Sequence, residues 1–390
     1  MECTAGAIWD ERYLAYDFGD HPLNPVRLDL TIRLARELGV LDQLDVTAPQ
    51  PADEAQLLTV HGAAYLEAVR QASDDPMFAG FGLGTSDDPV FPGMYDASAL
   101  VAGGSAQAAL RMWRGEVDHA VNIAGGLHHA MRDYASGFCI FNDVVLAIRT
   151  LLADGAKKIA YVDIDVHHGD GVQAAFYDDP RVLTISLHQD PRTLFPGTGL
   201  PSEIGTGEAA GTSVNVALPP GTDDAGWLRA FRAVVPGAVR AFKPDVLVSQ
   251  CGCDTHHEDP LANLELTVDG QRTAIAELHQ LAHDVAGGKW LAFGGGGYGL
   301  VRCVPRTWTH LLAEACGRPV DAQTPIPPGW VAHLRERGVR SELPETMGER
   351  PVPPVDPWVP GGSDWLDGAI GATRRAVFPL LGLDPDDPRD

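Results

Sequence analysis

Short β-rich runs alternate with amphipathic segments from residue 119 to residue 316, and this alternation constrains the fold more than any other feature. The predicted strands span residues 119–124, 158–166, 182–188, 213–218, 245–250 and 289–293. Predicted helices at 142–153, 225–242, 269–286 and 300–315 separate several of them. Such alternation favours parallel strands with helices on both faces of the sheet. The sequence therefore predicts an α/β fold around a mostly parallel sheet.

The two flanks of this region differ from it. Residues 1–118 are predicted to be a helical lead-in, with helices at 25–38 and 97–113 and a long loop at 80–92. Residues 318–390 contain 13 of the 30 prolines, and short helices are predicted there at 330–337 and 363–377. We therefore expect one main domain, residues 1–317, and a proline-rich extension, residues 318–390, that packs on its surface.

Composition excludes several classes of partner. The net charge of -24 disfavours binding to nucleic acid and to anionic membranes. It suits a cationic partner, such as a lysine-rich segment or a polyamine, although it could serve solubility alone. The six cysteines have no disulfide-framework spacing, the amino terminus does not resemble a signal peptide, and no apolar run could span a membrane. These features predict a cytoplasmic protein with reduced cysteines, and they leave the oligomeric state open.

The run from residue 161 to residue 171 ends an apolar strand with a dense set of acids and imidazoles. Asp163, Asp165 and His167 alternate, so in an extended strand their side chains would point to the same face. Such groups destabilise one another unless a cation lies among them. Helix capping beside hydrogen-bonded histidines is the plainer alternative, but capping does not need five ionisable groups in eight residues. The run therefore predicts a metal site.

Two further runs follow predicted strands. His128 and His129 come directly after the strand 119–124, and Asp163 and Asp170 could each orient one of these imidazoles by accepting its Nδ1 proton. Asp254 follows the strand 245–250 and is a candidate third ligand. Taken alone, a histidine pair is a weak signal, and a lone aspartate after a strand is more often a cap or turn residue. The combination favours a catalytic metal site.

A glycine-rich run at 294–299 follows the strand 289–293 and formally matches the dinucleotide-binding pattern G-x-G-x-x-G. No βαβ unit follows it and no acidic residue ends a following strand, so a dinucleotide site is rejected. The run also lacks the Gly-Lys-Ser/Thr ending of a P-loop. Its glycines would instead let the backbone approach a site closely and place Tyr298 there. A tyrosine hydroxyl is a suitable donor to a developing oxyanion.

Taken together, these motifs resemble the histone deacetylase superfamily, in particular the bacterial acetoin-utilisation deacetylase-like proteins. Eight matching segments occur in the family's order, at residues 20–27, 125–130, 136–139, 161–171, 186–188, 195–199, 250–254 and 294–298. The resemblance implies an arginase-deacetylase fold with a mostly parallel eight-stranded sheet flanked by helices, and it makes residues 1–317 the catalytic domain. Leu127, Cys251, Cys253 and residues 256–258 depart from the family pattern near the pocket, which affects substrate preference rather than chemistry.

The resemblance also implies a role for each matching residue. The implied zinc ligands are Asp165, His167 and Asp254, although two carboxylates and one imidazole would also suit Fe²⁺, Mn²⁺ or Co²⁺. The implied catalytic residues are His128, His129, Tyr298, Asp163 and Asp170. The implied substrate-binding residues are Gly137, Phe138 and Phe195 in the tunnel wall, Asp87 at the rim and Arg27 at the foot. A structural potassium site is implied at Asp163, Asp165, His167, Ser186 and Leu187.

The function that follows is metal-dependent hydrolysis of the acetyl amide of acetyl-lysine in proteins. Bacterial relatives suggest an acetylated metabolic enzyme, such as an acyl-CoA synthetase, as the partner. Three alternatives remain open at this stage: an acetylpolyamine amidohydrolase, a catalytically silent module that binds acetyl-lysine, and an arginase-type ureohydrolase. The paired histidines and Tyr298 argue against the ureohydrolase, which needs more metal-ligating acids.

Overall fold

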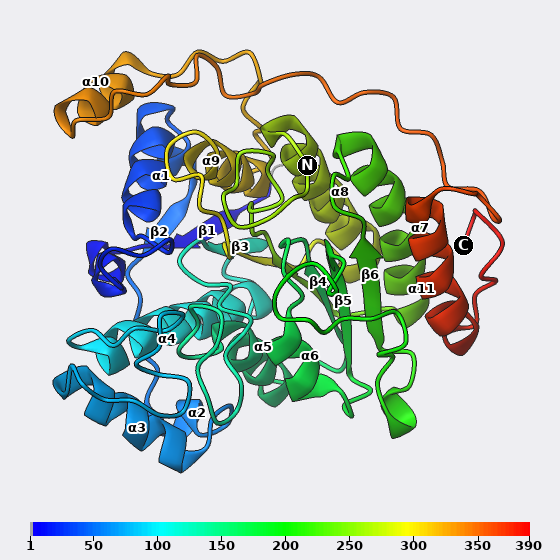
Figure 1. Ribbon diagram of the computed structural model, residues 1–390, viewed down its shortest axis with the longest axis horizontal. Helices are drawn as coiled ribbons and strands as arrows, with labels where there is room; N and C mark the ends of the chain where they lie inside the picture. The colour runs from blue at the N-terminus through cyan, green and yellow to red at the C-terminus, as the bar shows by residue number, and fades with distance from the viewer. Residues whose placement is uncertain (1–2) are drawn as a thin grey trace.

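An eight-stranded parallel sheet runs through the part of the chain that the computed structural model describes, residues 3–390 (Figure 1). Its strands are β1 (Ala5–Ile8), β2 (Asp45–Thr47), β3 (His119–Asn122), β4 (Ile159–Asp163), β5 (Val182–Gln189), β6 (Ser213–Leu218), β7 (Val246–Gln250) and β8 (Trp290–Phe293). Their order across the sheet is β2-β1-β3-β8-β7-β4-β5-β6, and every neighbouring pair is parallel. The predicted α/β fold with a parallel sheet is confirmed.

Helices cover both faces of the sheet (Figure 1). One layer contains α1 (Val26–Glu37), α7 (Asp224–Phe242), α8 (Val268–Ala286) and α9 (Val304–Ala315). The other contains α4 (Met94–Trp113), α5 (Asp143–Ala153) and α6 (Asp170–Phe176), with α2 (Glu54–Leu57) and α3 (Ala63–Asp74) at its margin. Three 3₁₀ turns, η1 (Glu11–Ala15), η2 (Leu41–Gln43) and η3 (Gly207–Ala209), complete the connections.

Local sequence explains where several helices begin and how closely they pack. The side chains of Asn142, Asp223 and Thr267 accept hydrogen bonds from the first turns of α5, α7 and α8, which satisfies backbone donors that would otherwise lack partners. In α4, a Cβ atom on Gly103 would lie only 2.0 Å from the carbonyl oxygen of Gln50. The small residues of α4 therefore let this helix pack directly against neighbouring backbone.

The prediction that residues 1–118 form a helical lead-in is wrong in one respect, because this region also contributes β1 and β2 to the sheet. β1 consists mostly of Ala and Gly, which have little β-propensity, and β2 has only three residues, so neither shows a clear strand pattern. Pairing with β3 holds β1 in the sheet, and β1 in turn pairs with β2. Tertiary contacts, rather than local propensity, make these segments strands.

The proline-rich segment extends across one side of the main body and carries two helices, α10 (Pro328–Glu336) and α11 (Trp365–Leu381) (Figure 1). α10 packs on α1, where the indole Nε1 of the buried Trp330 donates to the Leu30 carbonyl at 3.0 Å. α11 packs on α7 and β6, with Arg374 fully buried. Among residues 3–390, no helix is both long and apolar enough to cross a membrane.

Candidate active site

The candidate site lies where four adjacent strands, β3, β8, β7 and β4, end at the same edge of the sheet. His128 and His129 follow β3, Tyr298 follows β8, Asp254 follows β7, and Asp165 and His167 follow β4. Because these strands are parallel, the loops after them open on one side, which is where functional groups gather in such folds. The strand order therefore brings together runs that lie far apart in the sequence.

Asp165, His167 and Asp254 form a buried cluster, with exposed fractions of 0%, 8% and 0%. Nδ1 of His167 lies 3.1 Å from Oδ1 of Asp165 and 3.1 Å from Oδ2 of Asp254. One ligand atom from each residue lies within 4.8 Å of the other two. Two carboxylates and one imidazole that converge in this way are a plausible ligand set for a divalent metal ion.

The ionisation of the three side chains in this cluster favours a bound cation. Burial and the charge of Asp165 raise the pKa of Asp254 to about 8. Burial would lower the pKa of His167, but Asp165 and Asp254 raise it to about 10. The two carboxylates are thus stabilised together only with a positive charge between them, and a bound metal ion would supply that charge in place of the His167 proton.

Backbone and amide groups hold Asp165 in place. Its Oδ2 accepts hydrogen bonds from Nε2 of Gln250 at 2.7 Å and from the backbone N–H of Gly296 at 2.8 Å. A Cβ atom on Gly252 would lie 2.1 Å from Asp165 Oδ2, and one on Gly296 would lie 1.9 Å from Asp254 Oδ2. Only glycine leaves room for the carboxylates at these two positions. Gln250 lies in a motif that the sequence singled out, but its contact with Asp165 was not predicted.

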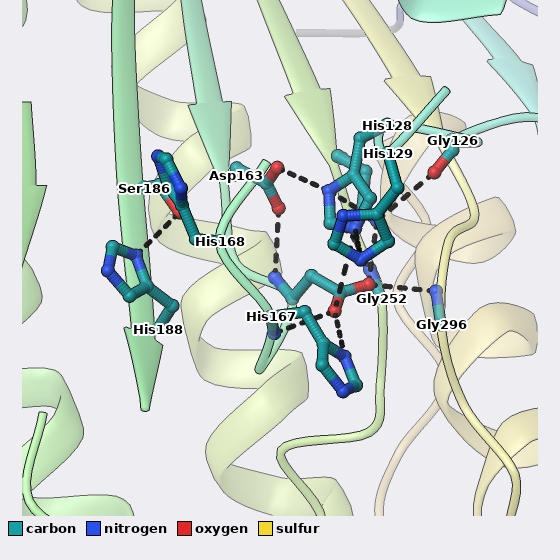
Figure 2. A network of polar contacts seen from close by, with 12 residues as sticks. Gly126, His128, His129, Asp163, His167, His168, Ser186, His188, Gly252 and Gly296 are labelled. Carbon is teal, nitrogen blue, oxygen red and sulfur yellow. Dashed lines mark hydrogen bonds and ion pairs between the residues drawn. The ribbon is translucent and has the colours of Figure 1, made fainter. Parts of the chain in front are cut away.

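His128 and His129 lie side by side next to the cluster, with their Nε2 atoms 3.1 Å apart (Figure 2). Nδ1 of His128 donates to Asp163 at 2.7 Å, and Nδ1 of His129 donates to Asp170 at 2.7 Å. Each carboxylate therefore fixes the tautomer of one imidazole and leaves its Nε2 facing the site. The two pairs are those expected from the sequence.

The two imidazoles differ in their electrostatics. Burial lowers the pKa of His128, but Asp163 and Asp165 outweigh burial and raise it to about 9. Burial and the neighbouring His128 lower the pKa of His129 below its ordinary value. Near neutral pH, and without a metal ion, His128 is therefore the cationic member of the pair and His129 the neutral one.

A pocket of about 260 Å³ of atom-free space leads to these groups. Gly137, Phe138, Leu23 and Tyr298 line it together with the two imidazoles, Asp165 and His167. The Phe195 ring is 44% exposed, and its centroid lies 5.0 Å from that of His129, so this ring borders the site on another side. A Cβ atom on Gly137 would lie 2.3 Å from the His129 ring, which explains glycine there.

Asp87 and Asp88 lie beside the pocket in the long loop at 80–92. Oδ2 of the half-buried Asp87 accepts a hydrogen bond from the Gly137 N–H at 2.8 Å, which ties this loop to the pocket wall. The next residue, Asp88, is 1% exposed, and its Oδ1 has no hydrogen-bond partner. Burial, with Asp87 adding to it, raises the pKa of Asp88 to about 9. No sequence motif had singled out Asp88.

Tyr298 is supported from two sides. Its backbone N–H donates to Oδ2 of the buried Asp259 at 2.9 Å. Nη1 of Arg27 donates to the carbonyls of Gly295 at 2.8 Å and Gly297 at 3.1 Å, so this buried guanidinium contacts the glycine loop itself. Burial, then Asp254 and Asp165, raise the pKa of Tyr298 well above 10.0, so the hydroxyl stays protonated and able to donate. The contact with Asp259 was not predicted.

Of the residues implied for potassium, Asp165 and His167 belong to the metal cluster, and the other three lie where β4 and β5 pair. Asp163 is the register partner of Ser186, and Leu187 follows in β5. Oγ of Ser186 lies 2.8 Å from Nδ1 of the buried His188 (Figure 2). Asp163 therefore lies on the strand next to Ser186 and Leu187. The loop that carries Asp165 and His167 begins at the same edge of the sheet.

The prediction that Asp163, Asp165 and His167 share one strand face is wrong. β4 ends at Asp163, so Asp165 and His167 lie in the loop after the strand and not on one strand face with Asp163. The backbone N–H of Asp165 donates to Asp163 Oδ1 at 3.1 Å, and that of His167 donates to Asp165 Oδ1 at 2.9 Å. For the backbone N–H groups of Asp165 and His167, these hydrogen bonds take the place of pairing with a neighbouring strand. They turn Asp163 toward His128 while Asp165 and His167 meet Asp254.

Comparison with known proteins agrees with this site. The histone deacetylase domain matches residues 21–315, so the chain belongs to the histone deacetylase family, a class of metal-dependent deacetylases. The acetoin utilization protein AcuC of Bacillus subtilis (strain 168) is 42% identical over 335 residues, which cover 85% of this chain and 86% of that protein. AcuC of Staphylococcus aureus (strain MSSA476) is 35% identical over 83% of this chain and 84% of its own length. AcuC of Staphylococcus xylosus is 34% identical over 85% and 87%.

Proposed function

We propose that this protein hydrolyses the acetyl amide of acetyl-lysine in proteins, and that zinc is its catalytic metal. One observation carries the proposal. Two imidazole–carboxylate pairs, with Nε2 atoms 3.1 Å apart, adjoin a cluster of three metal ligands at the end of a narrow pocket. Amide hydrolysis needs an activated water, a general base, a general acid and a donor to the oxyanion, and these residues can supply each of them.

In this mechanism His129 is the general base. Its pKa is lowered by burial and by His128, so its Nε2 can accept a proton from the attacking water near neutral pH. Asp170 holds the Nδ1 proton and stabilises the imidazolium that forms. His129 then returns the proton to the leaving amine. His128, held cationic by Asp163, assists by its charge.

Tyr298 stabilises the oxyanion in this mechanism. Its protonated hydroxyl lines the same pocket as the two imidazoles and can donate to the carbonyl oxygen as negative charge develops there. A divalent metal held by Asp165, His167 and Asp254 would supply Lewis acidity and lower the pKa of water from about 15.7 toward about 7. Arg27 and Asp259 keep the glycine loop and Tyr298 in position.

The walls of the pocket support a lysyl chain as the substrate. The Phe138 and Tyr298 rings meet edge to face at 5.7 Å, and with Phe195 they present apolar surface suited to methylene groups. Asp87 at the rim could accept a hydrogen bond from a substrate backbone N–H. The net charge of -24 would favour a cationic segment around the modified lysine. An acetylated acyl-CoA synthetase is our proposed class of protein partner.

The metal and the potassium ion are separate parts of the proposal. Zinc suits the three ligands and an open fourth position, but carboxylates also bind Fe²⁺, Mn²⁺ and Co²⁺ well. We propose potassium at Asp163, Asp165, His167, Ser186 and Leu187. It would stabilise the loop after β4 without entering the reaction.

A hydrolysis panel with defined metals tests the proposal. Metal-free enzyme is reconstituted with Zn²⁺, Fe²⁺, Mn²⁺ or Co²⁺ and assayed on acetyl-lysine peptides, acetylputrescine and agmatine. We expect the largest kcat/KM for acetyl-lysine peptides, with zinc restoring activity. Higher activity on acetylputrescine would replace the proposal with a polyamine amidohydrolase, and turnover of agmatine would indicate a ureohydrolase. Tight binding of acetyl peptides without turnover by any metal form would indicate a silent binding module.

A further inference from the structure

Four potential metal ligands converge at the amino-terminal edge of the sheet, at the opposite end of the strands from the active site. Cys3 lies just before β1, His119 is the first residue of β3, and His279 and His283 lie one turn apart near the end of α8. One ligand atom from each residue lies within 4.8 Å of the other three. The deacetylase mechanism uses none of these residues.

Two distances in this cluster are close to those of a tetrahedral zinc site. With zinc–nitrogen and zinc–sulfur bonds of about 2.0 and 2.3 Å, a tetrahedron separates two ligand nitrogens by about 3.3 Å and sulfur from nitrogen by about 3.6 Å. Sγ of Cys3 lies 3.6 Å from Nε2 of His283. Nε2 of His283 lies 3.0 Å from Nε2 of His279. Small movements of the side chains would bring the four ligand atoms to the distances of a tetrahedral zinc site.

Outer hydrogen bonds already orient two of the imidazoles for a metal ion. Nδ1 of His119 donates to the Ala315 carbonyl at 2.7 Å, and Nδ1 of His279 donates to the Glu314 carboxylate at 2.9 Å. Each ring therefore leaves its Nε2 unprotonated and available to a metal ion. A carboxylate or carbonyl on the second nitrogen is the usual support of a metal-binding histidine.

A plain hydrogen-bonded histidine cluster does not account for His119. In that interpretation the His283 Nε2–H would donate to His279 Nε2, and the cluster would need no ion. His119, however, is fully buried, and its Nε2 has no hydrogen-bond partner. A buried polar atom without a partner destabilises the fold by about 1–3 kcal/mol, so it calls for an explanation. A metal ion at the centre would give this nitrogen a partner.

We propose that Cys3, His119, His279 and His283 bind a second divalent metal ion, zinc, in a closed structural site. One thiolate and three imidazoles select zinc over Mg²⁺ or Ca²⁺, which prefer oxygen ligands. Four protein ligands leave no position for water or substrate, and this is what distinguishes structural from catalytic zinc sites. The ion would fasten the start of β1 to β3 and α8.

Cobalt substitution tests the site on the full chain, prepared with its affinity tag removed. Co²⁺ bound by a thiolate gives a sulfur-to-metal charge-transfer band in the near ultraviolet, and the ligand set Asp165, His167 and Asp254 contains no sulfur. We expect wild-type protein to bind two equivalents of metal and to show this band. Cys3→Ser should lose the band and weaken the second equivalent at least about 100-fold, more than the loss of a supporting hydrogen bond.

Matched variants separate the two sites. Cys253→Ser, which removes a thiol next to the proposed catalytic ligand Asp254, should keep the band. Asp165→Ala should also keep it while losing the other equivalent. Glu314→Gln should weaken the second equivalent about 10- to 100-fold, because it alters the support of His279. A wild-type protein with one equivalent and no band would overturn the proposal, as would a band that persists in Cys3→Ser.

Discussion

The two ends of the central sheet carry histidine clusters of opposite design. At the carboxyl edge, Asp165, His167 and Asp254 offer three ligands and border a pocket. At the amino-terminal edge, Cys3 and three histidines offer four ligands. Three ligands leave a coordination position for water and substrate, whereas four close it. Ligand number, rather than histidine content, therefore distinguishes the catalytic edge from the structural edge.

Electrostatics separate the two edges as well. The catalytic edge buries the carboxylates Asp163, Asp165 and Asp254 together, at 0% exposure, and they need positive partners. The amino-terminal edge holds its imidazoles with one backbone carbonyl and one carboxylate, Glu314. Loss of metal should therefore affect the catalytic edge more, because it leaves carboxylates facing one another.

The strongest test of this contrast is Asp165→Ala. Removal of one ligand from a three-ligand site should abolish retention of the catalytic metal and deacetylase activity, while the cobalt–thiolate band of the other edge remains. Metal analysis, the absorption spectrum and a peptide assay measure these outcomes. Asp154→Ala, which alters an acid paired with Arg114 on the surface, is the matched control. Normal catalytic metal content in Asp165→Ala would refute the ligand set.

The next largest effect is expected for Tyr298→Phe. Loss of an oxyanion donor typically lowers kcat by about 10²–10³, or roughly 3–4 kcal/mol, and metal content should not change. Steady-state kinetics on an acetyl-lysine peptide measure this. Tyr95→Phe, which removes a hydroxyl that contacts Arg70 outside the site, should leave kcat unchanged. Full activity in Tyr298→Phe would exclude the proposed role.

A smaller effect is expected for Asp259, which positions Tyr298 through its backbone N–H. Asp259→Ala removes this acceptor and should lower kcat about tenfold, the equivalent of one hydrogen bond of about 1.4 kcal/mol. Asp259→Asn keeps an acceptor oxygen and should recover most of the rate. Equal losses in both variants would show that the charge of Asp259, and not its hydrogen bond, matters to the catalytic edge.

Substitution of Asp88 measures how much an ionised carboxylate buried at the catalytic edge would lower the stability of the protein. Its pKa is raised from 3.8 to about 9, so the unfolded chain loses this proton at lower pH than the folded chain does. The group therefore lowers the stability of the wild type as pH rises from 3.8 toward 9. Asp88→Asn should be more stable than the wild type by a margin that is near zero at pH 4 and grows by up to about 1.4 kcal/mol per pH unit. Urea unfolding at several pH values measures this margin, and a margin independent of pH would contradict it.

The smallest effect is expected for Cys3→Ser on catalysis. The amino-terminal edge contributes nothing to the proposed reaction, so kcat should stay within about twofold of the wild type, which is about 0.4 kcal/mol of activation free energy. Thermal stability in the presence of Zn²⁺ should fall, because a ligand that binds only the folded state stabilises it. A large loss of kcat in this variant, with catalytic metal intact, would show that the two edges are coupled.

The sequence predicted the central part of the fold well and the first part poorly. The six strands expected between residues 119 and 293 are all present, because each has enough apolar residues to show its type. β1 and β2 were missed, since β1 consists mostly of Ala and Gly, which have little β-propensity, and β2 has only three residues. For the site, the predictable residues were those in dense runs at strand ends: Asp165, His167, Asp254, His128 and His129. Asp88 and Asp259 lie outside such runs, and only their contacts in the structure identify them.

The sequence alone was enough to predict the groups at the carboxyl edge, because they follow predicted strands and parallel strands end together. The tertiary structure alone decided that β4 stops at Asp163 and that Asp165 and His167 turn toward Asp254. It also decided the cluster at the other edge. Cys3, His119 and His279 are far apart in the chain and meet only because β1, β3 and β8 are neighbours and α8 packs beside them.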